Sequence, residues 1–172
     1  MAWNGTKTFT NEPLIATDMN TYISNNLDAL KVPPSGQTVL NAGADVTTTS
    51  TSWENIGGVT PTFTQTITTA GASSKVLVGF HANIRNATGI VYLDFTVDGV
   101  AHAGDDGIIG STGNVTVPGV IFPFVRQVTG LTAGAHVFIM RWKVSAGTAT
   151  LYAGAGTGSA DLHPQFWVSE IS

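Results

Sequence analysis

The sequence predicts a mainly β protein, an antiparallel β-sandwich preceded by a short N-terminal arm and an α-helix. Thr is abundant, with 25 residues against 7 for Glu and Lys together. β-branched side chains favour pleated sheet, whereas Glu and Lys favour helix. After residue 36, apolar and polar residues alternate at period two, and 20 Gly and 7 Pro supply turns between the alternating segments. A chain of 172 residues is long enough for one such domain and a short appendage.

The N-terminal segment predicts an arm and one amphipathic helix. The arm over 1–16 carries Trp3 and Phe9 among polar residues, and Thr17 offers an N-cap oxygen. A helix over 18–30 places one apolar stripe at i, i+3 and i+4 spacing, formed by Met19, Tyr22, Ile23, Leu27 and Leu30. A helix this short is marginal alone. It therefore docks on its own β domain, joins a trimeric bundle, or fills a socket on a larger assembly.

Residues 32–36 contain two consecutive prolines and end the helix. We therefore divide the chain into 1–36, comprising arm, helix and Pro-rich linker, and 37–172, the sandwich. Within the sandwich, strands are expected over 60–68, 75–84, 90–97, 120–128, 136–144, 148–152 and 166–171.

Side-chain alternation assigns the faces of these strands. Over 75–84, one face carries Val76, Val78, Phe80, Ala82 and Ile84. Over 90–97, the outward positions are Tyr92, Asp94 and Thr96, and an Asp98-Gly99 hairpin turn follows.

The segment 120–128 is apolar on both faces. Phe122, Phe124 and Val128 lie on one face, which fills the sandwich. Ile121 and Val125 lie on the other face, which must contact something else, and we assign them to a subunit interface.

Charge is unusually scarce. Only 10% of residues are charged, against about 25% in an ordinary soluble domain, so much of the surface is expected to lie against other chains. The formal net charge of −4 argues against a nucleic-acid partner. The sequence has no Cys, no secretory signal pattern and no apolar run long enough for a membrane helix.

No catalytic constellation is apparent, and we expect no enzyme, metal or cofactor. The four histidines, His81, His102, His136 and His163, lack ligand spacing and are interpreted as structural. Asp105 and Asp106 lie in a Gly-flanked loop that could hold Ca²⁺, but the alternating oxygens and distal Glu of a calcium loop are missing, so a solvated loop tip is favoured.

A surface contact is the remaining candidate site. Trp142 shares its period with Phe138 and Met140 and is expected in the core, whereas Tyr92 points outward. We assign surface contact to Tyr92, Asp105 and Asp106, because an aromatic ring stacks on sugars and carboxylates accept from sugar hydroxyls.

Two stretches carry a family resemblance. Trp3, Phe9 and the segment 17–30 resemble the N-terminal segment of tailed-bacteriophage virion proteins, with matches at Asn20, Asn26, Leu27 and Leu30, although Ser24-Asn25 replaces the usual Arg-Asp. The residues of 131–138, 141–142, 147–151 and 166–171 resemble the last three strands of a TNF/C1q-like jelly roll.

The resemblance implies a homotrimeric virion protein on the tail or capsid exterior. Its anchor to other virion proteins would be Trp3, Phe9, Met19, Ile23, Leu27 and Leu30. Three functions stay open: a tail-tip or fibre knob that contacts a host glycan or protein, a capsid decoration or head-fibre trimer, and a free carbohydrate-binding module.

Overall fold

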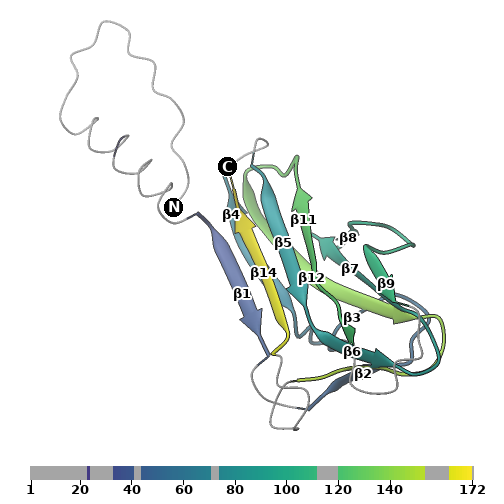
Figure 1. Cartoon of the computed structure of the whole chain (residues 1–172). Coiled ribbons are helices and arrows are strands. Elements are labelled where there is room, and N and C mark those ends of the chain that lie inside the picture. Colours follow the sequence, from purple (N-terminus) through teal and green to yellow (C-terminus); the bar gives the residue numbers. More distant parts are fainter. Residues whose placement is uncertain are drawn as a thin grey trace, which may run out of the picture.

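The computed structural model describes residues 23, 33–40, 44–70, 74–111, 120–153 and 163–171 (Figure 1), and for 111, 120 and 121 it describes only the backbone. The expected arm and nearly all of the expected helix lie outside these residues. Of the expected anchor residues only Ile23 is described, and half of its surface is exposed.

The described residues form fourteen strands. They are β1 (Ser35–Val39), β2 (Val46–Thr48), β3 (Glu54–Asn55), β4 (Thr64–Thr69), β5 (Val76–His81), β6 (Asn83–Asn86), β7 (Val91–Val97), β8 (Val100–Ala101), β9 (Ile109–Ser111), β10 (Val120–Ile121), β11 (Phe124–Val128), β12 (Gly134–Val144), β13 (Ala149–Leu151) and β14 (Gln165–Glu170). All pairs are antiparallel. The prediction of an antiparallel β-sandwich is confirmed.

One layer of the sandwich is a bent sheet. Its first half has the order β1-β14-β5-β11, and its second half has the order β2-β13-β6-β10 when read from the same edge. Each strand of one half thus continues into a strand of the other. At the bend, the amide of Phe122 donates to the carbonyl of Ala82 at 2.9 Å, so the two halves stay joined.

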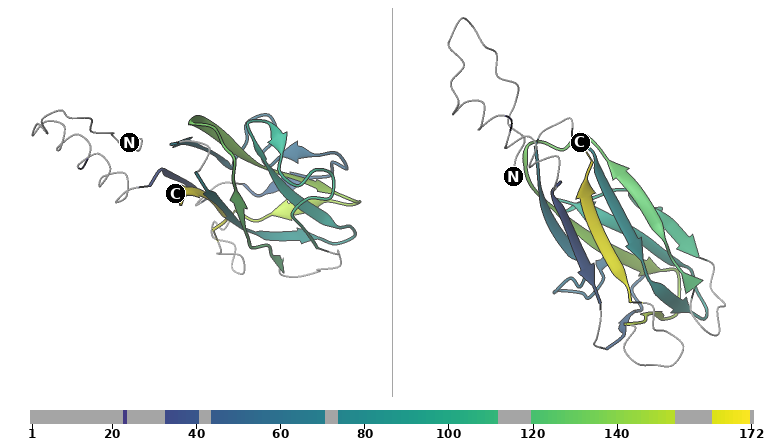
Figure 2. Two further views of the ribbon diagram at one scale, coloured as in Figure 1. Left: turned by 90° about the horizontal axis from the view of Figure 1, so that it is seen from above. Right: turned by 60° about the vertical axis from the view of Figure 1, so that its left-hand side comes forward.

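The other layer is built around β12, which has eleven residues. β3 and β4 pair along one edge of β12, and β7 pairs along the other. β8 and β9 then pair with the two ends of β7. The two layers face each other in the views of Figure 2.

The pairing follows one rule. When strands that continue each other are taken together, eight segments remain: β1/β2, β3/β4, β5/β6, β7, β8/β9, β10/β11, β12 and β13/β14. The first pairs with the last, the second with the seventh, the third with the sixth and the fourth with the fifth. This is one long hairpin rolled into two layers.

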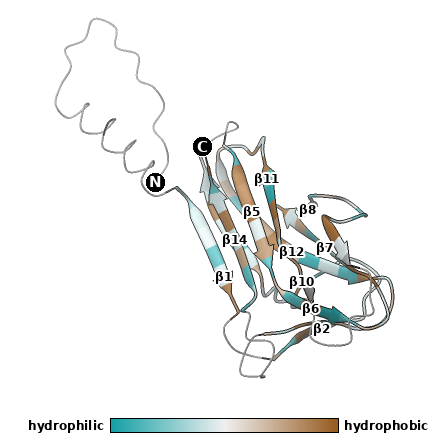
Figure 3. Cartoon of the chain, viewed as in Figure 1, coloured by the Kyte–Doolittle hydropathy of each residue, from teal (hydrophilic) through white to brown (hydrophobic). Residues whose placement is uncertain are grey.

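The core fills the space between the layers. Val76, Val78, Phe80, Ala82 and Ile84 are at most 2% exposed, which confirms the predicted inward face. Trp142 is also fully buried, as predicted. In Figure 3 the central strand β5 is mostly apolar, whereas the edge strand β1 is neutral to polar along most of its length, as expected for a core centred on the inner strands.

Two expectations need correction. The single strand expected over 120–128 is two strands, because Pro123 has no amide to donate and separates β10 from β11 at the bend. Asp94 and Thr96 do point outward from β7, but both are buried. The connection between β8 and β9 covers Asp94, whose Oδ1 accepts from the amide of Ala103. The predicted Asp98-Gly99 turn is present, and both residues have positive φ, of 52° and 81°.

Candidate functional site

The connection between β8 and β9, residues 102–108, lies over the outer face of β7 and β12 and is held mainly through its backbone. The amide of Ala103 donates to Asp94 Oδ1 at 3.2 Å. The carbonyls of Gly104 and Asp105 accept from Arg141 at 3.2 Å and from Lys143 Nζ at 2.8 Å. We call residues 102–108 the outer loop. These hydrogen bonds do not use the side chains of Asp105 and Asp106.

A buried ion pair lies under the outer loop. Asp94 is fully buried, and its Oδ2 accepts from Arg141 Nε at 3.0 Å and from Nη2. A carboxylate without access to water is stable only when its charge and its oxygens are paired. Arg141 and the amide of Ala103 supply that pairing, so the loop and the ion pair stabilise each other.

Two aromatic rings flank Lys143 on this face. Its Nζ lies 4.8 Å from the centroid of the Trp53 ring and 5.4 Å from that of Tyr92. Arg141 Cζ lies 4.5 Å from the Trp53 ring, within the range of a cation–π interaction. Trp53 also packs against Gly107, where an added Cβ would come within 3.0 Å of the indole. Trp53 is thus a support for the outer loop.

The three expected receptor residues fall in this region. Tyr92 is partly exposed on β7, and Asp105 and Asp106 are exposed in the outer loop. Lys143 connects the first two, because it lies near the Tyr92 ring and donates to the Asp105 carbonyl. Within the described residues, neither Asp105 nor Asp106 forms an ion pair through its carboxylate. Trp53, Arg141 and Lys143 were not among the expected site residues.

The opposite face of the molecule, on the outside of β1, β14, β5 and β11, has no charged residue at its paired outward positions, although the exposed Lys75 lies at its border, directly before β5. In the paired registers no outward position is Asp, Glu, Lys or Arg; these positions are Ser35, Gln37, Val39, Gln165, Trp167, Ser169, Leu77, Gly79, His81, Val125 and Gln127. We call this set the neutral face.

An aromatic side chain covers the middle of the neutral face. The indole of Trp167 lies directly on Gly79, where an added Cβ would come within 2.1 Å of the ring. Gly79 pairs with Val125, which is 54% exposed. Of the two expected interface residues, Val125 thus lies on this face. The backbone of Ile121 pairs with Asn83 in the other half of the sheet, and its side chain is not described.

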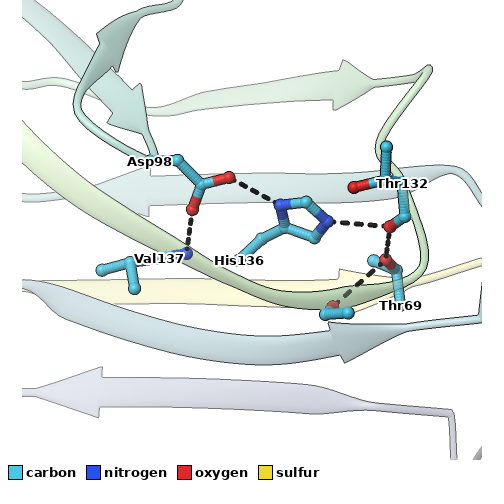
Figure 4. A network of polar contacts seen from close by, with 6 residues as sticks. Thr69, Asp98, Thr132, His136 and Val137 are labelled. Carbon is cyan, nitrogen blue, oxygen red and sulfur yellow. Dashed lines mark hydrogen bonds and ion pairs between the residues drawn. The ribbon is translucent and has the colours of Figure 1, made fainter.

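A histidine network lies at the start of β12 (Figure 4). His136 is buried; its Nδ1 lies 2.6 Å from Asp98 Oδ2 and its Nε2 lies 2.9 Å from the carbonyl oxygen of Thr132. The hydrogen bond to Thr132 and that to Asp98 raise the pKa of His136. The hydrogen bonds from His136 and from the amide of Val137 lower the pKa of Asp98.

The described residues contain no group of three or more His, Asp or Glu side chains placed to hold a metal ion. Among them there is also no helix long and apolar enough to cross a membrane.

The ion pair under the outer loop yields a testable prediction. Asp94→Ala should destabilise the fold by roughly 3–5 kcal/mol, because it leaves Arg141 as an uncompensated, mostly buried charge and frees the Ala103 amide. Asp105→Ala is the matched control and should change stability by less than about 0.5 kcal/mol, because only its carbonyl is bonded. Chemical denaturation measures both. Equal stability of the two variants would contradict the assignment.

No protein-family model and no curated protein sequence matches the chain. Among solved structures, it is similar to a chain of infectious bursal disease virus, Gx strain, with 16% identity and a TM-score of 0.33 over 80% of this chain and 36% of that one. It is also similar to the VP2 subviral particle of infectious bursal disease virus, with 12% identity and a TM-score of 0.34 over 81% of this chain and 37% of that one. The chain spans little more than a third of these viral chains. TM-scores this low assign neither a family nor a function.

Proposed function

We propose that this chain is a non-enzymatic structural protein of a phage virion, a jelly-roll knob that assembles as a homotrimer through the neutral face. The observation that carries the proposal is the lack of charge on that face. An ordinary soluble domain has about 25% charged residues over its whole sequence, whereas this chain has 10%. A face with a central Trp167 and an exposed Val125 gains by leaving water.

The fold supports a jelly roll of the TNF/C1q-like kind. Eight segments that pair first with last, second with seventh, third with sixth and fourth with fifth are the pairing expected of a rolled hairpin. Threefold symmetry comes from the resemblance of the C-terminal strands to that family. The virion location and the anchor at Trp3, Phe9, Met19, Ile23, Leu27 and Leu30 come from the resemblance of the N-terminal segment.

Host contact is proposed for the outer loop, on the face opposite the neutral face. Asp105 and Asp106 would accept from the hydroxyls of a surface glycan, and Tyr92 would stack nearby. A preorganised loop loses little conformational freedom on binding, which favours affinity. This part of the proposal places the knob on a tail tip or fibre. A knob that only decorates the capsid would need the same anchor and trimer without this contact.

The assembly is tested by the mass of the full chain in solution. Multi-angle light scattering should give three times the chain mass of 17.8 kDa. Val125→Asp should lower this mass, because a carboxylate would be buried at a desolvated contact. Val100→Asp is the matched control, since Val100 is 71% exposed on β8 in the other layer, and it should leave the mass unchanged. A monodisperse mass of 17.8 kDa for the unaltered chain would rule out the trimer.

Host contact is tested by adsorption of virions that carry the double variant Asp105→Ala/Asp106→Ala. Hydrogen bonds to charged groups are worth about 1.5–3 kcal/mol each, so adsorption should fall by an order of magnitude or more. The backbone-held loop should keep its shape, and incorporation into virions should be normal. Thr66→Ala, an exposed position on β4, serves as the control. Unchanged adsorption of the double variant would show that Asp105 and Asp106 do not contact the host. Capsid decoration would then be the favoured function.

A further inference from the structure

His136 connects three separate parts of the chain. It lies at the start of β12, and its two ring nitrogens face acceptors from two different connections. Asp98 belongs to the turn between β7 and β8, and the Thr132 carbonyl belongs to the connection between β11 and β12. Figure 4 shows the imidazole between these two acceptors.

Both contacts require a proton on each nitrogen. A carbonyl oxygen accepts only, and so does an ionised carboxylate. A neutral imidazole has a single N–H, so in either tautomer one nitrogen lone pair would face an oxygen lone pair. Only the imidazolium donates to Asp98 and to Thr132 together.

The partners are themselves held by further hydrogen bonds. The other oxygen of Asp98, Oδ1, accepts from the amide of Val137 at 2.8 Å. The carbonyl of Thr132 also accepts from the hydroxyl of Thr69 at 2.6 Å. Neither acceptor is therefore free to turn away without breaking a second bond, and the geometry around His136 is fixed from both sides.

No other charge takes part in this network among the described residues. β4 contributes the Thr69 hydroxyl and Ile67, which pairs with His136. Glu170 is buried on β14, but its carboxylate accepts from the amide of Ala70 at 3.3 Å. Arg141, further along β12, pairs with Asp94 on the outer face. Asp98 is thus the only charged partner of His136 in this part of the chain.

We propose that His136 is a proton-operated latch, closed when the imidazole is charged, which holds the β7–β8 turn and the β11–β12 connection on the start of β12. Deprotonation removes one of the two hydrogen bonds and loosens one connection. The His136 network lies at the end of the sandwich where β1 begins. There Ser35, the first residue of β1, pairs with Ser169 near the end of β14. The next residue of β14, Glu170, pairs with Val76, which also pairs with Val128 at the end of β11, just before the β11–β12 connection. The latch does not depend on the proposed virion role.

The direction of the pH dependence follows from both partners. Because the pKa of His136 is raised, the charged His136 contributes fully to stability when the pH is below 6.5, the ordinary pKa of histidine. This contribution is lost as the pH rises through the raised pKa. The lowered pKa of Asp98 means that its contribution is complete above its ordinary value of 3.8 and is lost as pH falls through the lowered pKa. The latch is therefore fully closed between these two ordinary values.

The test is an NMR titration of the full chain with ¹³C-labelled histidine. The His136 resonance should titrate above the ordinary histidine pKa of 6.5. Asp98→Asn, which keeps the turn because Asn tolerates positive φ, should shift the His136 midpoint downward. His81→Gln should leave it unchanged, since His81 lies on β5 and, among the described residues, its side chain makes no hydrogen bond or ion pair with this network. A His136 midpoint at or below its ordinary value, or one that Asp98→Asn does not move, would overturn the proposal.

Thermal unfolding gives an independent readout. The melting temperature of the unaltered chain should exceed that of His136→Gln at about pH 5.5. The difference between the two melting temperatures should narrow at about pH 9, because His136 then loses its proton and its charged hydrogen bonds. A gap that is independent of pH would mean a merely structural histidine and would also overturn the proposal. If His136→Gln fails to fold, the same comparison is made with Asp98→Asn.

Discussion

The alternation along β12 is the constraint on which both faces of its layer depend. Its inward residues, Phe138, Met140, Trp142 and Val144, are at most 1% exposed and fill the core between the layers. Its outward residues Arg141 and Lys143 hold the outer loop by its carbonyls. A slip of one residue in the pairing with β7 would send Trp142 into water and Arg141 into the core. The same register that buries the core therefore also positions the candidate site.

The two outer faces of the sandwich differ because their strands carry different outward residues. On the β12 layer, cations lie among Trp53, Tyr92 and the backbone of the outer loop. On the β5 layer, glycine at position 79 leaves room for the Trp167 indole over the sheet, and Gly79 pairs with the exposed Val125. A hydrated, charged face and an uncharged, aromatic face suit different neighbours. This division is the physical basis for proposing that the first contacts a host surface and the second another subunit.

Much of the sandwich is predictable from local alternation, and the rest depends on distant pairing. The inward faces around Val78 and Leu93 follow from period two, and the Asp98-Gly99 turn follows from its residue types. The short strands β2, β3, β8 and β9 have too few residues for a periodic signal. The division of 120–128 could have been read from Pro123, which cannot donate to a ladder.

The candidate site shows the same limit. Tyr92 was found because it alternates with buried Val91 and Leu93. Lys143 and Arg141 carry the same outward signal on β12, but only the register with β7 brings them beside Tyr92 and Asp94. The burial of Asp94 could not be foreseen, because it depends on a loop that folds back over its own strand. His136 was interpreted as structural, and its two acceptors come from connections 4 and 38 residues away in sequence.

The central claim is that the neutral face is covered by another copy of the chain and the outer-loop face is not. Hydroxyl-radical footprinting with mass spectrometry measures this directly, using Trp167 for the first face and Tyr92 for the second. If another copy covers the neutral face, Trp167 should be oxidised several-fold more slowly in the unaltered chain than in Val125→Asp, while Tyr92 should be oxidised equally in both. Equal oxidation of Trp167 in the two proteins would contradict this claim.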